Sequence, residues 1–281
     1  MQTRDTLSRR SFLAISALAP FAASLANSKE NIPVGLELYS VRDELQKDLL
    51  GTVRSVAKMG YQCVEFYAPY YDWTLDYARQ VRQELDALGL RCYSTHNGSE
   101  ALKPEGIQKA IELNQVIGAR YIVLAHPGEV KDADGWKRVA DLLNQANHTL
   151  SAHGLRAGYH NHDAEWRPVA GKRPIEILAE NTDKSVMMQL DVGTCLEAGS
   201  DPVAWVQANP GRIRSMHLKD WSPQKGYKVL FGEGVAPWKN LLAAAESQGA
   251  IEFYLIEQEG SDYPQLETAQ RCLTNFRHLR M

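Results

Sequence analysis

The sequence predicts a single closed barrel of eight parallel strands, each followed by a helix: a (β/α)₈ or TIM barrel. Three observations favour this fold. Short strand-like runs alternate with amphipathic helical stretches about every 30 residues. The number of such runs is eight, and none is followed by the Gly-x-Gly-x-x-Gly pattern of an open dinucleotide-binding sheet. The chain has 281 residues, 44% of them hydrophobic, which suits one barrel with one large core.

The expected strands are short runs rich in apolar and aromatic residues, bounded by polar turns. In chain order they span Val34–Tyr39, Cys63–Phe66, Arg91–Thr95, Tyr121–Ala125, Arg156–His160, Val186–Asp191, Ile213–Leu218 and Phe253–Glu257.

The expected helices lie between these runs. Apolar residues recur at three- and four-residue spacing over 75–88 and 107–117, which is the period of a helix with one buried face. Gly60, Gly89 and Gly118 each follow such a stretch. Glycine at this position predicts a left-handed helix cap.

Residues 1–26 have the pattern of an export signal. Arg9 and Arg10 are followed by the uncharged run 14–26, which is too short for a permanent membrane span and ends in small residues suited to cleavage. The arginine pair resembles a twin-arginine signal, which exports folded proteins. The sequence therefore predicts a mature domain, 27–281, in the periplasm. The alternative is a basic tail on a cytosolic protein.

The charge excludes some partners. Removing residues 1–26 removes three arginines and one aspartate, which takes the formal net charge from −3 to −5. An acidic protein offers no footprint for nucleic acid, so no nucleic-acid partner is expected. No other apolar run reaches membrane length, so no membrane anchor is expected after cleavage.

The cysteines show no metal-binding spacing. An oxidising compartment would permit a disulfide between Cys63 and Cys92, which fall in successive expected strands. A protein that folds before export does not need one, so four free thiols are expected, at Cys63, Cys92, Cys195 and Cys272.

Polar side chains gather at the expected carboxyl ends of the strands, where active sites of such barrels lie. Five of the eight histidines fall there, which a random scatter would not produce. The candidates at these ends are Glu37, Tyr39, Glu65, Tyr67, His96, His126, His160, His162, Asp191, His217, Lys219, Glu257 and Glu259.

The last four strands predict a metal site. Asp191 ends an apolar strand abruptly, and a buried carboxylate needs a partner or a cation. His160, His217 and Glu257 stand at the ends of the neighbouring strands. Four adjacent strands that each supply one nitrogen or oxygen donor favour a divalent metal with open positions for substrate.

Six motifs in this order resemble the sugar phosphate isomerase/epimerase family of xylose isomerase-like TIM barrels. The resemblance runs from about Ile32 to the C-terminus and does not specify a substrate. The motifs are GLELYSVRDEL at 35–45, GYHNHD at 158–163, LDVG at 190–193, HLKD at 217–220, FGEG at 231–234 and IEQE at 256–259.

The resemblance implies the ligand set. Family members such as ketose 3-epimerases hold a divalent metal, often manganese, with Glu, Asp, His and Glu from strands five to eight. Asp191, His217 and Glu257 match three of these positions, and His160 stands where the first glutamate is usual. A histidine there favours manganese, zinc or cobalt over magnesium. Glu165 remains the alternative fourth ligand.

The resemblance also implies a reaction: metal-assisted proton transfer next to the carbonyl of a sugar or keto-sugar, giving an isomerase or epimerase. Glu257 or His160 would remove the proton, and His162 or Lys219 would return one. A non-phosphorylated small-molecule sugar is expected, because no basic cluster follows the last strands. Candidate substrate-binding residues are Tyr39, Glu65, His96, His126 and Glu259.

The sequence is also compatible with other functions. Expulsion of a β-oxygen would make the same scaffold a 3-keto-glycoside lyase or hydratase, or an inosose-type dehydratase. An abasic-site endonuclease shares the barrel, but the negative charge and the export signal argue against it. A non-catalytic periplasmic sugar-binding protein is a further alternative. Family members are often dimers or tetramers, so a homo-oligomer is expected, although no sequence feature fixes an interface.

Overall fold

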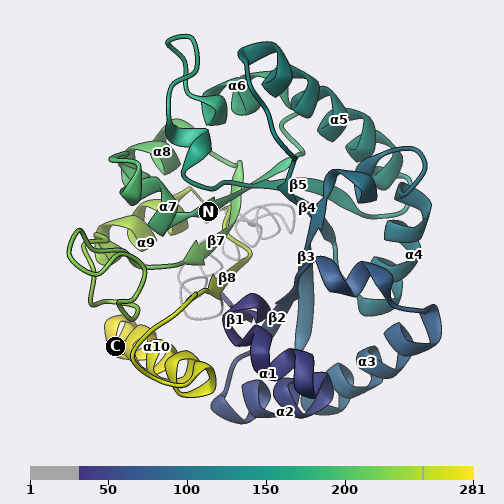
Figure 1. Cartoon of the computed structure of the whole chain (residues 1–281), viewed down its shortest axis with the longest axis vertical. Coiled ribbons are helices and arrows are strands. Elements are labelled where there is room, and N and C mark those ends of the chain that lie inside the picture. The colour runs from purple at the N-terminus through teal and green to yellow at the C-terminus, as the bar shows by residue number, and fades with distance from the viewer. Residues whose placement is uncertain (1–31, 249) are drawn as a thin grey trace, which may run out of the picture. The chain divides into compact units, whose positions relative to one another are not determined.

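Eight parallel strands close into a barrel in chain order, with β8 paired to β1, in the computed structural model of the protein (Figure 1). The (β/α)₈ prediction is confirmed. The structure describes residues 32–248 and 250–281, so the expected export signal at 1–26 lies outside the described residues. The strands are β1 (Val34–Glu37), β2 (Cys63–Phe66), β3 (Arg91–Gly98), β4 (Tyr121–His126), β5 (Arg156–His160), β6 (Met187–Asp191), β7 (Ile213–Leu218) and β8 (Phe253–Ile256).

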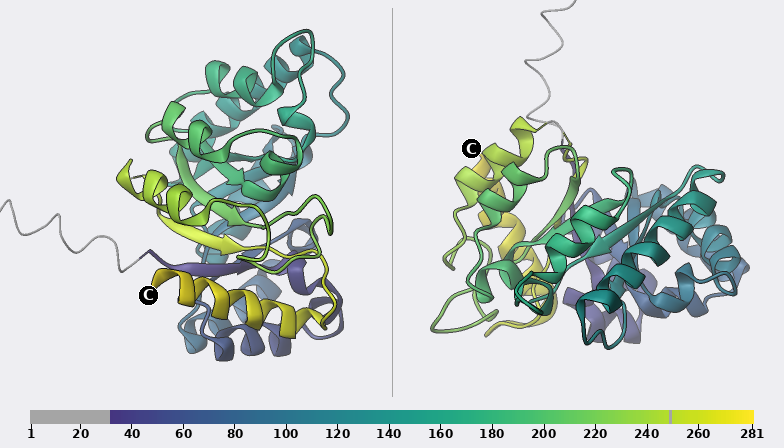
Figure 2. Two further views of the ribbon diagram at one scale, coloured as in Figure 1. Left: turned by 90° about the vertical axis from the view of Figure 1, so that its left-hand side faces the viewer. Right: turned by 90° about the horizontal axis from the view of Figure 1, so that it is seen from above.

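Helices surround the barrel, and α10 lies beside the helices that follow β1, so the last element packs against the first (Figure 2). Within the described part of the chain, no helix is both long and apolar enough to cross a membrane. The α-helices are α1 (Arg42–Lys47), α2 (Leu49–Met59), α3 (Leu75–Leu88), α4 (Ile107–Ile117), α5 (Ala133–Ser151), α6 (Pro174–Asn181), α7 (Val192–Glu197), α8 (Pro202–Ala208), α9 (Trp238–Ser247) and α10 (Gln265–Arg280). Short 3₁₀ helices are η1 (Leu38–Val41), η2 (Ala68–Asp72), η3 (Ser99–Leu102) and η4 (Ala164–Trp166).

Local sequence signals set the helix ends. The Asp48 carboxylate and the Thr74 hydroxyl accept backbone N–H groups at the starts of α2 and α3, which otherwise have no partner. Gly60, Gly89 and Gly118 end α2, α3 and α4 in the left-handed conformation, with φ of 96°, 68° and 91°. The predicted glycine caps are confirmed.

The barrel interior changes from apolar to polar along the strand direction. Its lower layer is a hydrophobic cluster of Cys63, Tyr121, Val123, Met187, Phe253 and Leu255, with Tyr93 packed against it. Side chains two residues further along a strand lie on the same face. Glu65 therefore stands above Cys63, Gln189 above Met187 and Glu257 above Leu255, so the polar groups collect at the carboxyl ends of the strands.

Three expected strands extend past the observed ones: those of β6 and β8 by one residue each, and that of β1 by two. The run Val34–Tyr39 was expected as a strand, but β1 ends at Glu37 and the next residues form η1. The reason is a capping interaction, because Tyr39 N donates to Glu37 Oε1 across 3.3 Å and turns the chain. Tyr39 therefore lies on the rim with 38% of its surface exposed, rather than inside the barrel wall.

The four cysteines are free thiols, as the sequence predicted, and all are buried. Burial raises the pKa of each thiol well above its ordinary range, to about 11 for Cys272.

One carboxylate accepts five hydrogen bonds in and beside the loop between β7 and α9. Asp220 Oδ2 accepts the backbone N–H groups of Gly232 and Gly234 at 2.9 and 3.1 Å and the Trp238 indole N–H at 2.8 Å. Its Oδ1 accepts the backbone N–H groups of Trp221 and Ala236. This fixes the loop directly beside the last two strands.

Candidate active site

Side chains from six strands meet inside the barrel at the carboxyl ends of the strands. The register of β6 and β7 places Asp191 beside His217, and all members are at least nine-tenths buried. We call this group the site cluster. It consists of Glu65, His96, His160, Gln189, Asp191, His217, Lys219 and Glu257.

His217 links two carboxylates. Its Nδ1 lies 2.6 Å from Glu257 Oε2 and its Nε2 lies 2.7 Å from Glu65 Oε2. Burial by itself lowers the pKa of an imidazole, but the charge of Glu65 and the hydrogen bonds that His217 donates to both carboxylates raise the pKa of His217 to about 10. Without a metal, His217 is therefore an imidazolium that donates both ring protons.

Glu65 accepts hydrogen bonds at both carboxylate oxygens. Its Oε1 accepts from the Ser94 hydroxyl and from Gln189 Nε2, the latter at 3.0 Å. Its Oε2 faces His217 and also His96 Nε2, at 3.1 Å. Burial would raise the pKa of Glu65, but the two histidines and these hydrogen bonds lower it to about 2. Glu65 is thus a fixed anion below the barrel mouth.

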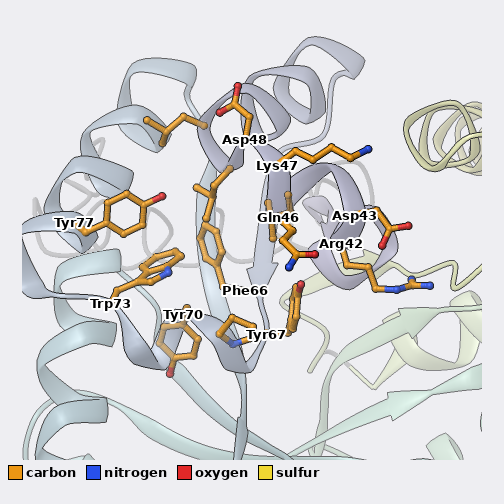
Figure 3. A pocket seen from close by; sticks show the side chains of 14 residues that line it. Arg42, Asp43, Gln46, Lys47, Asp48, Phe66, Tyr67, Tyr70, Trp73 and Tyr77 are labelled. Atoms are coloured by element: carbon orange, nitrogen blue, oxygen red, sulfur yellow. The ribbon is translucent and has the colours of Figure 1, made fainter.

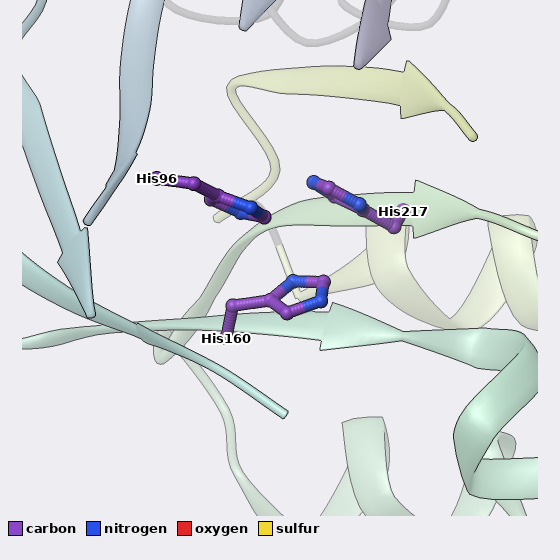
Figure 4. Close-up of side chains that lie close together, drawn as sticks. All are labelled: His96, His160 and His217. Carbon is purple, nitrogen blue, oxygen red and sulfur yellow. The ribbon is translucent and has the colours of Figure 1, made fainter. Parts of the chain in front are cut away.

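Gln189 sets the tautomer of His160. Its amide nitrogen donates to Glu65, so its oxygen faces the imidazoles, 2.7 Å from His96 Nε2 and 3.1 Å from His160 Nδ1. An amide oxygen only accepts, so both ring nitrogens carry hydrogens. The other nitrogen of His160, Nε2, therefore has a free lone pair and lies 3.8 Å from Asp191 Oδ2. Figure 4 shows His96, His160 and His217 converging from three strands.

Burial keeps both of these imidazoles neutral. It lowers the pKa of His160 well below the ordinary value, and the positive charges of His217 and Lys219 lower it further. Burial likewise lowers the pKa of His96, to about 4, although the charge of Glu65 opposes this. A neutral imidazole with a free Nε2 is the form that binds metals.

Asp191 is a buried carboxylate with one cation, Lys219, beside it. Its Oδ1 accepts the Thr194 backbone N–H at 3.0 Å, and its Oδ2 lies 3.4 Å from Lys219 Nζ. Burial raises the pKa of Asp191 even though the Lys219 charge opposes this. A second cation beside this carboxylate would relieve the penalty of burying it.

Lys219 is a buried ammonium surrounded by carboxylates. Its Nζ lies 3.5 Å from Glu257 Oε1 and also contacts Asp191 and Glu259. Burial would lower its pKa, but these three carboxylates raise it. Burial would also raise the pKa of Glu257, whereas the charges of Lys219 and His217 lower it. Lys219 therefore holds a proton directly beside the Glu257 carboxylate.

The donor set fits a divalent metal. Ligand atoms of His160, Asp191 and Glu257 all lie within 4.8 Å of one another. One neutral nitrogen and two carboxylates form a mixed donor set that suits manganese, zinc or cobalt. His217 contacts Glu257 through its Nδ1. The structure therefore brings together three of the four residues expected from the sequence, and the fourth, His217, is bonded to Glu257.

Glu165, the alternative fourth ligand, points elsewhere. Its Oε1 accepts from the Tyr159 hydroxyl at 2.5 Å and its Oε2 from the His162 backbone N–H at 2.9 Å. Tyr159 packs against Trp136 of α5, outside the barrel wall. The structure thus places His160, and not Glu165, with Asp191 and Glu257.

The remaining candidates form the rim of the site. The half-buried His162 lies above His160, with ring centroids 5.0 Å apart, and stacks on the exposed His126 at 5.4 Å. Glu259 is exposed and reaches Lys219, and Tyr39 packs edge-on against Tyr67. Glu65 and His96, expected as substrate-binding residues, lie deeper, with their polar atoms in the network around Gln189.

Two residues of the site were given no role by the sequence. Gln189 precedes Asp191 by two positions on β6, and this strand spacing is the signal that places both inside the barrel. Glu37 is 1% exposed, and its Oε2 has no hydrogen-bond partner among the described residues. Burial, together with the negative charges of Glu65 and Glu257, raises the pKa of Glu37 well above its ordinary value, so it carries a proton.

The sequence profile of the xylose isomerase-like TIM barrel family matches residues 53–278, which is most of the chain and includes every member of the site cluster. The chain belongs to this family. The resemblance seen in the sequence motifs is confirmed.

Several of the similar proteins carry the names of sugar epimerases or isomerases. The L-ribulose-5-phosphate 3-epimerase UlaE of Salmonella paratyphi C is 26% identical over 273 residues, covering 86% of this chain and 93% of the relative. A crystal structure of a sugar phosphate isomerase/epimerase from Parabacteroides distasonis has a TM-score of 0.75 at 24% identity, covering 91% of this chain and 97% of that one. The structure of the IOLI protein with a bound zinc atom has a TM-score of 0.68 at 16% identity, covering 89% and 99%.

Proposed function

We propose that this protein is a divalent-metal-dependent enzyme of the isomerase/epimerase type, which moves a proton next to the carbonyl of a non-phosphorylated sugar or keto-sugar. The observation that carries the proposal is the meeting of His160, Asp191 and Glu257 ligand atoms within 4.8 Å at the barrel mouth. The names of the relatives support the reaction class.

His160, Asp191, His217 and Glu257 would hold the metal, and the metal when bound would polarise the carbonyl and an adjacent hydroxyl of the sugar. Gln189 holds the His160 ring in the required tautomer, which is the role of an outer hydrogen-bond partner in metal sites. Glu65 fixes His217 from the opposite side.

The candidate proton-transfer groups are Glu257 and two residues close to the proposed metal ligands. The pKa of Glu257 lies below its ordinary value, so this side chain is an anion and is the candidate base for the carbon-bound proton. The Lys219 ammonium lies 3.5 Å from Glu257 Oε1 and is the candidate acid that returns a proton. His162, half-buried above His160, is in place to exchange protons between this interior and water.

A non-phosphorylated substrate is supported by the loop after β7. The backbone N–H groups of Gly232, Gly234 and Ala236 would form an anion-binding nest, but the Asp220 carboxylate already occupies them. Lys219 is likewise engaged with carboxylates. We propose that the segment 1–26 exports the protein to the periplasm, where free sugars and glycosides are available.

A lyase or dehydratase is the second candidate, and a specific observation favours it. Glu165, the alternative fourth ligand after β5, faces Tyr159 and leaves His160 as the donor from β5. An epimerase needs a second base on that side, whereas an elimination needs an acid for the leaving oxygen. The Lys219 ammonium supplies such an acid.

The test combines metal analysis with NMR in D₂O. The purified protein is analysed for bound metal and then incubated with a panel of free ketoses and 3-keto-glycosides. Exchange of one carbon-bound proton for deuterium in a metal-dependent manner supports the proposal, and release of the aglycone identifies the lyase. Glu257→Gln should abolish exchange and Glu165→Gln should retain it. Sugar binding with neither metal nor exchange would instead establish a non-catalytic binding protein.

A further inference from the structure

A cleft of about 690 Å³ opens beside the barrel mouth, and none of the 14 residues that line it belongs to the site cluster (Figure 3). One wall is the segment after β2, from Phe66 to Tyr77, and the other runs from Arg42 to Leu50 in α1 and the start of α2. Both walls follow the carboxyl ends of their strands. The cleft therefore lies on the same face of the barrel as the candidate active site.

The first wall is a fixed aromatic surface. The Trp73 ring packs edge-on against Phe66 and Tyr77, with centroids 5.0 and 5.3 Å apart. Trp73 also contacts the buried Tyr70, whose hydroxyl donates to Asn97 Oδ1 at 2.6 Å. These rings hold their positions before any ligand arrives, which lowers the entropy cost of binding.

The aromatic wall also carries polar side-chain groups that make no hydrogen bond to another described residue. Tyr67, Trp73 and Tyr77 are half-buried, and their side-chain O–H and N–H groups make no hydrogen bond to another described residue. The amide of the exposed Gln46, on the opposite wall, is likewise unpaired among the described residues. Aromatic faces flanked by unpaired polar groups suit a ligand with apolar C–H faces and many hydroxyls.

The charges around the cleft balance. Two cationic residues, Arg42 and Lys47, and two anionic residues, Asp43 and Asp48, line the second wall, so neither an anion nor a cation is selected. This balance favours a neutral polyhydroxylated ligand over a phosphate ester or a basic peptide.

The cleft shares a wall with the barrel mouth. Tyr67 lines the cleft and directly follows β2, the strand that carries Glu65 of the site cluster. Tyr39 packs against Tyr67 at 5.3 Å, and Arg42 stacks on Tyr39 and donates to the Glu259 carbonyl. Glu259 in turn contacts Lys219 of the site cluster.

We propose that this cleft is a saccharide subsite, which binds a neutral sugar ring joined by a glycosidic bond to the ring held at the barrel mouth. The inference rests on the proposed function, since it assumes that a sugar occupies the mouth. It makes the substrate a disaccharide or larger glycoside rather than a free monosaccharide.

The test compares disaccharides with their constituent monosaccharides on the metal-loaded protein. The probes are cellobiose, maltose, lactose and trehalose, with glucose and galactose as references, and binding is measured by saturation-transfer NMR titration. At least one disaccharide should bind about tenfold more tightly than its monosaccharide, with saturation on both rings. Equal affinities across the whole panel would overturn the subsite.

Variants on both walls locate the effect. Trp73→Ala removes the aromatic surface, and Gln46→Trp fills the cleft from an exposed position that has no structural partner. Each should reduce disaccharide affinity to that of the monosaccharide and leave monosaccharide affinity unchanged, whereas Tyr263→Ala, an exposed tyrosine outside the cleft, should change neither. A variant that weakens both sugars equally contradicts the proposal.

The two proposals fail separately. Deuterium exchange on monosaccharides with no disaccharide preference would remove the subsite and keep the proposed reaction. A disaccharide preference that depends on Trp73, without exchange on any sugar, would keep the subsite and remove the reaction.

Discussion

His217 and Glu65 join two strands that are not neighbours in the barrel: Nε2 of His217 on β7 lies 2.7 Å from Oε2 of Glu65 on β2. This ion pair is fully buried. The charged forms of both residues therefore contribute to folding only over the pH range in which both persist.

The first prediction concerns the stability of the metal-free protein against pH. The pKa of His217 is raised from 6.5 to about 10 on folding, so its contribution is complete below pH 6.5 and is lost as the pH rises towards 10. The pKa of Glu65 is lowered from 4.5 to about 2, so its contribution is present above pH 4.5 and is lost below it. Urea unfolding midpoints should fall from pH 6.5 to pH 10, and His217→Gln should flatten that slope.

The second prediction contrasts two buried glutamates. Glu65→Gln removes one partner of a buried ion pair and should lower the free energy of unfolding by about 3–5 kcal/mol. Glu37 already carries a proton, so Glu37→Gln is nearly isosteric and should change it by less than about 1 kcal/mol. Urea denaturation of the metal-free variants measures both values. Equal losses would show that Glu37 is ionised in the folded protein.

The third prediction concerns protons released on metal binding. His217 is an imidazolium in the metal-free site, so it must lose a proton before it ligates. Calorimetric titration with Zn²⁺ at pH 7, in buffers of different ionisation enthalpy, should show about one proton released per ion. If no proton is released, His217 remains bonded to both carboxylates and the metal is held without it.

The fourth prediction concerns Gln189. Gln189→Leu removes the amide oxygen that orients His160 and should weaken metal affinity about 10–100-fold. Glu165→Gln is the matched control and should leave metal affinity unchanged. Competition with a chromophoric chelator measures both. A larger loss of metal affinity in Glu165→Gln than in Gln189→Leu would show that Glu165, and not His160, is the fourth ligand.

The fifth prediction concerns the loop held by Asp220. Asp220→Ala leaves four backbone N–H groups and the Trp238 indole without their acceptor. Amide hydrogen exchange over 221–237 should accelerate, while exchange in β3 and β4 should not change. Asp220→Asn keeps one acceptor oxygen and should have a smaller effect.

The barrel and its polar end were accessible from the sequence because strand and helix periods are local signals. Asp191, His217 and Glu257 each stand at or next to the end of a strand, and parallel strands bring their carboxyl ends together. The extent of β1 was not accessible, because the turn at Tyr39 depends on one side-chain hydrogen bond from Glu37.

The hydrogen-bond partners within the site could not be predicted from the sequence either. The choice between His160 and Glu165 depends on where each side chain turns after β5, and Tyr159 attracts Glu165 away from the interior. The role of Gln189 depends on four partners from other strands, namely Glu65, His96, His160 and Ser215. Spacing along one strand places a residue inside the barrel but does not identify its partners.

The burial of the cysteines makes them reporters of global opening. Each sulfur is enclosed and reluctant to ionise, so an added aromatic disulfide reagent reaches it only when the surrounding fold comes apart. The rate at which the coloured thiolate is released in a native sample then reports the rate of global unfolding, and no labelled residue has to be introduced. The same shielding lets the protein be handled in air without reductant.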